Sequence, residues 1–315
     1  MENQEKLLRG LSPPELSRTD HPVQALLAAA LTVTAAIAEA PPGRAPEKPQ
    51  LEAAFRRMYE LRFDEARSEI FAYRHAHPDD PLGAAAEAAS YLFEEFNQEG
   101  VLTSEFFLDD NRLVGGVQGQ PDPVRRAAFL TANESARRMA RERLEANPND
   151  PDGLFDLTLA DGMQGDFEAL IEKRQLPALA LIRRAEKEAT RLLTVRADAQ
   201  DAYVALGAAN YIIGCLPVYK RLLLWFGGVR GDRRRGMDQL QVAAERGHYL
   251  RPLAQALLAL AAEREDQLDR ARTLFEDLVR EFPVNPVFAR ELALARRCGA
   301  SMRPCGSSRF TDSPP

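Results

Sequence analysis

The feature that most constrains the fold of this 315-residue chain is a residue spacing that returns along it. In its clearest form, an alanine is followed by large apolar residues four and seven positions later and by a proline at the twelfth. Copies of this form begin at Ala66 and at Ala271. A third copy begins at Ala136 and carries Ala140 and Arg143 at the fourth and seventh positions. A fourth begins at Ala185, carries Ala189 at the fourth position and lacks the proline.

Elementary helix geometry explains the spacing. Residues four and seven positions apart lie on one face of an α-helix, and a small alanine lets a second helix approach that face closely. Proline ends the helix, and the Asp or Asn after it can cap the next one, so the segments HPDDP, NPNDP and FPVNP mark the same turn. The residues expected to pack the repeats together are Ala66, Pro78, Ala136, Pro148, Ala185, Leu206, Gly207, Ala271, Phe275 and Pro283.

Composition favours the same architecture. Alanine, leucine, arginine and glutamate dominate the chain, and all four are strong helix formers. No long run of valine, isoleucine and threonine suggests a central sheet. We therefore predict an all-α fold, a solenoid of stacked helix hairpins with irregular insertions.

The repeated segments resemble the tetratricopeptide repeat, whose pattern is W-x2-L-G-x2-Y, then A-x3-F, then P. The resemblance covers most of residues 51–295, with Leu206-Gly207 and Leu258-Ala259 at the Leu-Gly position. No unit has the tryptophan, and the marker alanines do not follow at a steady interval. The resemblance implies a partner-binding surface lined by the first helix of each pair. The candidate partner-binding residues on it are Tyr91, Asp161, Asn210 and Tyr211.

The segment RLLLWFGGVRGDRRRG, residues 221–236, interrupts the repeats, and Asp232 in it is a suitable N-cap for the helix that follows. Its surroundings resemble a block found in largely uncharacterised, often exported bacterial tetratricopeptide proteins, which implies an architectural glycine turn. The matching residues are Tyr211, Gly214, Leu216, Pro217, Gly231-Asp232-Arg233 and Gly236. The apolar residues either pack under the adjoining repeat or contact a membrane, and the arginines suit an anion. The candidates for membrane or anion contact are Leu223, Trp225, Phe226, Arg230, Arg233 and Arg234.

The N-terminal region differs in character from the repeats. Residues 25–38 are almost wholly apolar, and Ala36-Ile37-Ala38 is a suitable cleavage site for a secretory signal peptide. Residues 1–22 carry both acidic and basic side chains, however, and an alanine-rich first helix is the alternative. An exported location, in the periplasm or cell envelope, and a cytoplasmic location therefore both remain open.

These features divide the chain into three parts. Residues 1–45 are signal-peptide-like or disordered, residues 46–297 form the solenoid, and residues 298–315 form a disordered tail. Insertions are expected near 97–123 and 215–236, and Phe106 and Phe107 of the first are expected to pack onto the scaffold.

Charge and motifs argue against several classes of function. A net charge of −6 does not suit nucleic-acid binding. The sequence contains no HExxH, CxxC, GxSxG or Walker motif, so we predict no catalytic residue, cofactor or metal site. The predicted function is a non-catalytic scaffold that binds a peptide or a partner protein. The alternatives are a peripheral cell-envelope protein that contacts lipid or a lipophilic ligand through residues 218–236, and an enzyme whose site is assembled from distant residues.

Overall fold

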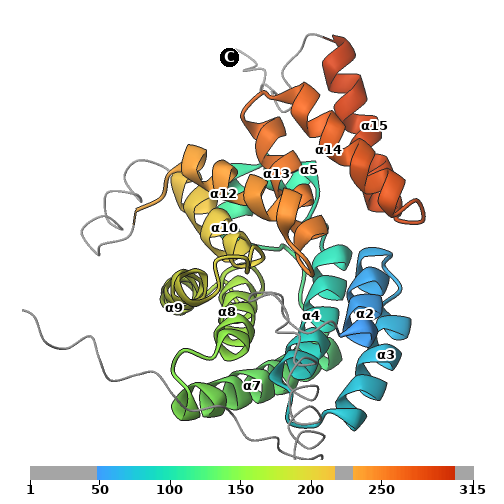
Figure 1. Cartoon of the computed structure of the whole chain (residues 1–315). Coiled ribbons are helices and arrows are strands. Elements are labelled where there is room, and N and C mark those ends of the chain that lie inside the picture. Colours follow the sequence, from blue (N-terminus) through green and yellow to red (C-terminus); the bar gives the residue numbers. More distant parts are fainter. Residues whose placement is uncertain (1–47, 217–229, 302–315) are drawn as a thin grey trace, which may run out of the picture. The chain divides into compact units, whose positions relative to one another are not determined.

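The computed structural model describes residues 48–216 and 230–301, and all regular secondary structure in these two ranges is helical. Helices that follow one another pack as hairpins, and the first helices of successive hairpins also contact each other (Figure 1). The hairpins are α2 (Pro49–Tyr59) with α3 (Phe63–Ala76), α4 (Pro81–Gln98) with α7 (Pro123–Ala146), α8 (Pro151–Asp166) with α9 (Gln175–Val195), α10 (Ala202–Cys215) with α12 (Arg233–Arg246), and α13 (Arg251–Arg264) with α14 (Leu268–Glu281). Helix α15 (Pro286–Ser301) packs against α14. The predicted all-α architecture of stacked hairpins is confirmed.

The three proline-containing turns separate helices as the sequence predicts. Helices α3, α7 and α14 end just before the exposed residues Pro78, Pro148 and Pro283, and α4, α8 and α15 begin at the second proline of each segment. The residue before that second proline caps the new helix. These caps, Asp80, Asp150 and Asn285, accept hydrogen bonds from backbone N–H groups of the first turn, which the helix itself leaves free.

The small residues of the repeat lie where helices approach each other most closely. The marker alanines Ala66, Ala136, Ala185 and Ala271 are buried, and so is Phe275. A β-carbon on Gly207 of α10 would lie 2.9 Å from the carbonyl oxygen of Gly236 on α12, which is closer than a real β-carbon approaches. Leu206 beside it is half-buried and packs against a second, smaller core cluster.

The insertion in the second hairpin forms two short helices rather than a loop without secondary structure: α5 (Ser104–Phe107) and α6 (Asp110–Gly115). Phe106 and Phe107 are buried, as expected, and the Phe107 ring stacks on that of Tyr211 with centroids 6.0 Å apart. Helix α5 contacts α13, in the fifth hairpin. The insertion therefore covers part of the later hairpins with a segment of the second.

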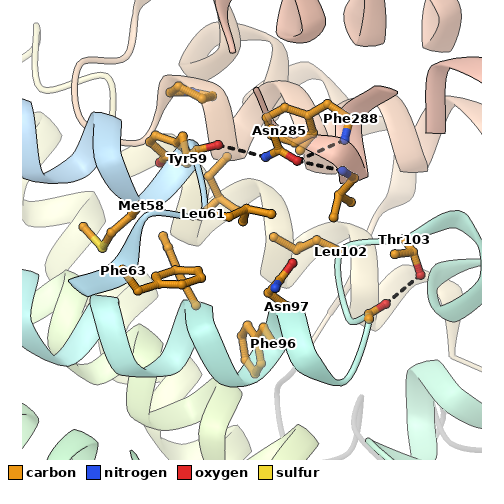
Figure 2. Close-up of a pocket in the computed structure, with 16 residues that line it drawn as sticks. Met58, Tyr59, Leu61, Phe63, Phe96, Asn97, Leu102, Thr103, Asn285 and Phe288 are labelled. Atoms are coloured by element: carbon orange, nitrogen blue, oxygen red, sulfur yellow. Dashed lines mark hydrogen bonds between the residues drawn. The ribbon is translucent and has the colours of Figure 1, made fainter. Parts of the chain in front are cut away.

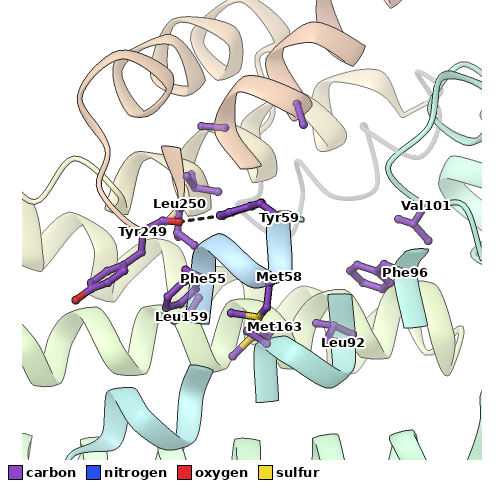
Figure 3. Close-up of a cluster of buried hydrophobic side chains, with 14 of the residues drawn as sticks. Phe55, Met58, Tyr59, Leu92, Phe96, Val101, Leu159, Met163, Tyr249 and Leu250 are labelled. Carbon is purple, nitrogen blue, oxygen red and sulfur yellow. Dashed lines mark hydrogen bonds between the residues drawn. The ribbon is translucent and has the colours of Figure 1, made fainter. Parts of the chain in front are cut away.

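Contacts also join the first hairpin to the last. The Tyr59 hydroxyl of α2 donates a 2.9 Å hydrogen bond to the carbonyl oxygen of Tyr249, which lies just before α13 (Figure 3). The side-chain nitrogen of Asn285, the cap of α15, donates to the carbonyl oxygen of Tyr59 at 2.8 Å. The Phe55 and Tyr249 rings are 4.9 Å apart, and one apolar cluster runs from α2 to α15. These contacts between distant repeats have no counterpart in the sequence pattern.

Several sequence predictions concern residues outside the described ranges. They include the signal-like N-terminal segment, the tail beyond residue 301, and the candidate membrane contacts Leu223, Trp225 and Phe226. Arg230, Arg233 and Arg234 are described and exposed, and Asp232 caps α12 by accepting from the backbone N–H of Arg235. None of the described helices is both long and apolar enough to cross a membrane.

Candidate functional site

Two of the four candidate partner-binding residues retain exposed surface. Tyr91 of α4 is half-buried, and the guanidinium of Arg67 lies over its ring, 5.0 Å from the centroid. Asn210 of α10 is also half-buried, and its side-chain nitrogen donates to Gln239 of α12 at 3.0 Å. Both side chains are engaged in contacts between helices of the fold.

The other two candidates are buried. Asp161 of α8 is 1% exposed, and its carboxylate accepts hydrogen bonds from Arg137 at 2.7 Å and Arg184 at 3.0 Å. Tyr211 is also 1% exposed, and the ring of Phe107 from the insertion stacks on its ring. A partner has no access to either side chain in this structure. We therefore assign Asp161 and Tyr211 to helix packing and do not include them in the candidate site.

The structure instead presents a pocket where the two ends of the repeat region meet. Figure 2 shows side chains converging on this pocket from α2, α4, the insertion and the start of α15. The volume of the pocket is about 60 Å³. Its apolar lining consists of Met58, Tyr59, Leu61, Phe63, Phe93, Phe96, Leu102, Pro252, Leu253, Ala256, Val287 and Phe288. Mostly apolar walls with a few polar groups are typical of sites that bind organic ligands or apolar side chains.

The polar groups at the pocket are, with one exception, already paired. The Thr103 hydroxyl donates to the carbonyl oxygen of Gly100 at 2.6 Å, and Asn285 bonds to Tyr59 and to its own helix. Burial raises the pKa of the Tyr59 phenol, which therefore stays neutral and acts as a donor. Asn97 is the exception: its half-buried amide points from α4 into the pocket (Figure 2) and makes no hydrogen bond to a described residue.

One residue of the pocket wall has an unfavourable backbone conformation. Leu61, in the turn between α2 and α3, has a φ of 60°, in the left-handed region that favours glycine. The equivalent turn of the fifth hairpin places Asp266 there, with a φ of 57°, and aspartate tolerates this region better than leucine. The left-handed conformation costs leucine about 1–2 kcal/mol. Leu61 is half-buried against the core and lines the pocket. Its side chain therefore gives the pocket wall an apolar surface that glycine would lack.

Sequence reasoning identified none of the residues that line this pocket. They come from both ends of the repeat region and from the insertion, and no local spacing connects them. The one local signal is a leucine at the turn after α2, between Glu60 and Arg62, where glycine is the usual residue.

The described residues also include buried carboxyl groups outside the pocket. Asp156 of α8 is 1% exposed, and burial raises its pKa well above the ordinary value. Glu263 of α13 and Glu291 of α15 are buried as well, and each has an oxygen without a hydrogen-bond partner. Within the described ranges, no three His, Cys, Asp or Glu side chains converge as a metal site.

Comparison with other proteins identifies no relative. No protein-family profile matches the chain, and neither a curated protein nor a solved structure does. The function must therefore be inferred from the described geometry.

Proposed function

We propose that this protein is a non-catalytic interaction module of the tetratricopeptide type, and that its pocket binds an apolar side chain of a partner polypeptide. The observation that carries the proposal is the apolar pocket with Leu61 in its wall, held in an unfavourable conformation. Residues that retain strain cluster at functional sites, where the surrounding structure enforces them. The stacked hairpins support the proposal because such repeats commonly present binding surfaces to other polypeptides.

The size of the pocket suits a side chain of the leucine or methionine class. The pocket volume of about 60 Å³ is far below the roughly 300–1,000 Å³ of sites that hold a drug-sized ligand, so the pocket suits a single side chain. Leucine and methionine each have four non-hydrogen side-chain atoms. Full burial of such a side chain contributes about 1.5–3 kcal/mol, which corresponds to roughly a tenfold to hundredfold gain in affinity.

Asn97 supplies the polar contact that a polypeptide partner requires. A side-chain amide offers both donors and an acceptor, and can therefore pair with the N–H and C=O of a peptide group beside the anchor side chain. Because no described residue pairs with the side-chain amide of Asn97, a partner does not have to displace a hydrogen bond between this amide and the described part of the chain. The combination of an apolar anchor and one amide pair favours a peptide over a purely lipophilic ligand.

A peptide-display selection tests the proposal. Random peptides displayed on phage are selected against the full chain, and the enriched peptides are synthesised and measured by isothermal titration calorimetry. Ala256→Leu places the same four-atom group inside the pocket from α13, and should weaken binding at least tenfold. Asn97→Ala should weaken it several-fold.

The matched control is Ala72→Leu, the same substitution at an exposed position of α3 that does not line the pocket. It should leave the affinity unchanged, and circular dichroism establishes that each variant is folded. The proposal fails if the selection enriches no peptide with a shared apolar position. It also fails if Ala256→Leu binds the enriched peptides as tightly as the unmodified chain does.

A further inference from the structure

Aromatic rings make up much of the wall of the pocket. Five of the 16 residues that line it are aromatic, whereas aromatic residues make up 7% of the whole chain. They are Tyr59, Phe63, Phe93, Phe96 and Phe288. Phe93 is half-buried and the other four are buried, and Figure 2 shows these four rings spread around the pocket. Because the rings come from α2, α3, α4 and α15, an anchor side chain contacts aromatic carbon on several sides.

Aromatic walls favour two kinds of side chain over an aliphatic one. The faces of the rings carry partial negative charge and attract a cation, whereas the sulfur of a thioether makes favourable contacts with the ring edges. A methylated lysine and a methionine are therefore the two anchors that such a wall recognises better than leucine.

The charges around the pocket decide between these two anchors. None of the described residues that line the pocket is charged. Glu60 lies between two lining residues in the sequence, but its carboxylate already pairs with Arg57 at 2.9 Å and with Arg62 at 3.4 Å. A cation buried without a counter-ion is strongly disfavoured. The pocket is thus electrostatically complementary to a neutral thioether rather than to a methylated ammonium group.

Leucine and methionine are equal in size, so the volume of the pocket does not distinguish them, but the sulfur atom does. A contact between sulfur and an aromatic ring contributes about twofold to tenfold in affinity. Away from aromatic rings, sulfur is more polar than a CH2 group and gains less from leaving water. A preference for sulfur over CH2 at the anchor position therefore reports on the rings.

We propose that the pocket recognises methionine, and that the partner polypeptide places the thioether of this side chain among the five aromatic rings. The inference rests on the proposed function, because it names the anchor side chain of the same site. It predicts that selection of displayed peptides enriches methionine, and not leucine, at the shared apolar position.

Isothermal titration calorimetry with one enriched peptide tests the inference on the full chain. Four versions of the peptide differ only at the anchor position, which carries methionine, norleucine, leucine or trimethyllysine. Norleucine has the shape of methionine with a CH2 group in place of the sulfur. We expect methionine to bind about twofold to tenfold more tightly than norleucine or leucine. Trimethyllysine should bind at least about tenfold more weakly than methionine, because its charge finds no counter-ion in the pocket.

Substitutions that remove a ring should remove this preference. Phe96→Leu and Phe288→Leu each keep an apolar side chain in the wall, and should lower the ratio of methionine affinity to norleucine affinity toward one. Phe71→Leu, the same substitution at a 75% exposed position of α3 that does not line the pocket, is the control and should leave the ratio unchanged. Circular dichroism establishes that each variant is folded, and the ratio compares two peptides on the same protein.

The inference is refuted if norleucine or leucine binds the unmodified chain as tightly as methionine does, or if trimethyllysine binds more tightly than methionine. It is also refuted if the preference for methionine survives both ring substitutions. In each of these cases peptides still bind at the pocket, so the proposed function stands. Absence of binding by all four versions would overturn the proposed function together with the inference.

Discussion

Asn285 offers the most direct test of how the first and last hairpins are joined. Its side chain has two tasks: the oxygen accepts from the backbone N–H groups of Val287 and Phe288, and the nitrogen donates to the carbonyl oxygen of Tyr59, 226 residues away. The residue is 3% exposed, so water cannot readily replace either partner. Substitution of Asn285 should therefore affect a helix end and a long-range contact together.

The expected loss in the free energy of unfolding follows from these two sets of hydrogen bonds. Loss of an N-cap costs about 1 kcal/mol, and a carbonyl left without a partner in a buried site costs about 1–3 kcal/mol. Asn285→Ala should therefore lower the free energy of unfolding by about 3 kcal/mol. Asp150 caps α8 in the same sequence context but makes no hydrogen bond to the first hairpin, so Asp150→Ala should cost only about 1 kcal/mol. Asn285→Asp retains the acceptor and loses the donor, and should cost about 2 kcal/mol.

Urea denaturation followed by circular dichroism measures these free energies, and an unchanged slope shows that the unfolded state is comparable between variants. Hydrogen exchange should show the loss of protection at the end of α2 in Asn285→Ala and Asn285→Asp, but not in Asp150→Ala. The reasoning is refuted if Asn285→Ala and Asp150→Ala destabilise the protein equally. In that case the bond from Asn285 to Tyr59 contributes nothing to stability.

Four further predictions concern backbone strain, close packing and buried charge. Lys173→Gly should stabilise the protein by about 1 kcal/mol in urea denaturation, because Lys173 has a φ of 58°. Leu61→Gly should leave the free energy of unfolding nearly unchanged, because it relieves the same strain but removes a half-buried side chain. The same substitution should weaken peptide binding in calorimetry. Gly236→Ala should lower the melting temperature strongly, since its β-carbon would lie 2.6 Å from the backbone nitrogen of Tyr211, whereas Gly162→Ala, with its nearest neighbour at 4.0 Å, should raise it. Burial raises the pKa of Glu263 to about 7, so the free energy of unfolding of the unmodified chain should fall between pH 4.5 and pH 7 relative to that of Glu263→Gln, by about 3 kcal/mol in total at 25 °C. An equal pH dependence of stability in both proteins would contradict the raised pKa.

The correct predictions from sequence are those that depend on neighbours along the chain. Helix ends at the prolines, the caps at Asp80, Asp150 and Asn285, and burial of the marker alanines all follow from spacing within one or two turns. The partner-binding surface could not be predicted from local spacing in this way. Family resemblance implied an open face that includes Tyr211, but a phenylalanine from another hairpin covers that side chain.

Local sequence thus determined that the chain is a series of helix hairpins, because hydrogen bonding, helical periodicity and proline geometry act over a few residues. Only the tertiary structure decided that α2 meets α15, that the insertion rests on α13, and that a pocket forms between them. Those contacts join residues separated by much of the chain, and their stability comes from apolar surface buried jointly by several hairpins. No single segment contains that information, since each apolar side chain has many possible partners until the hairpins have stacked.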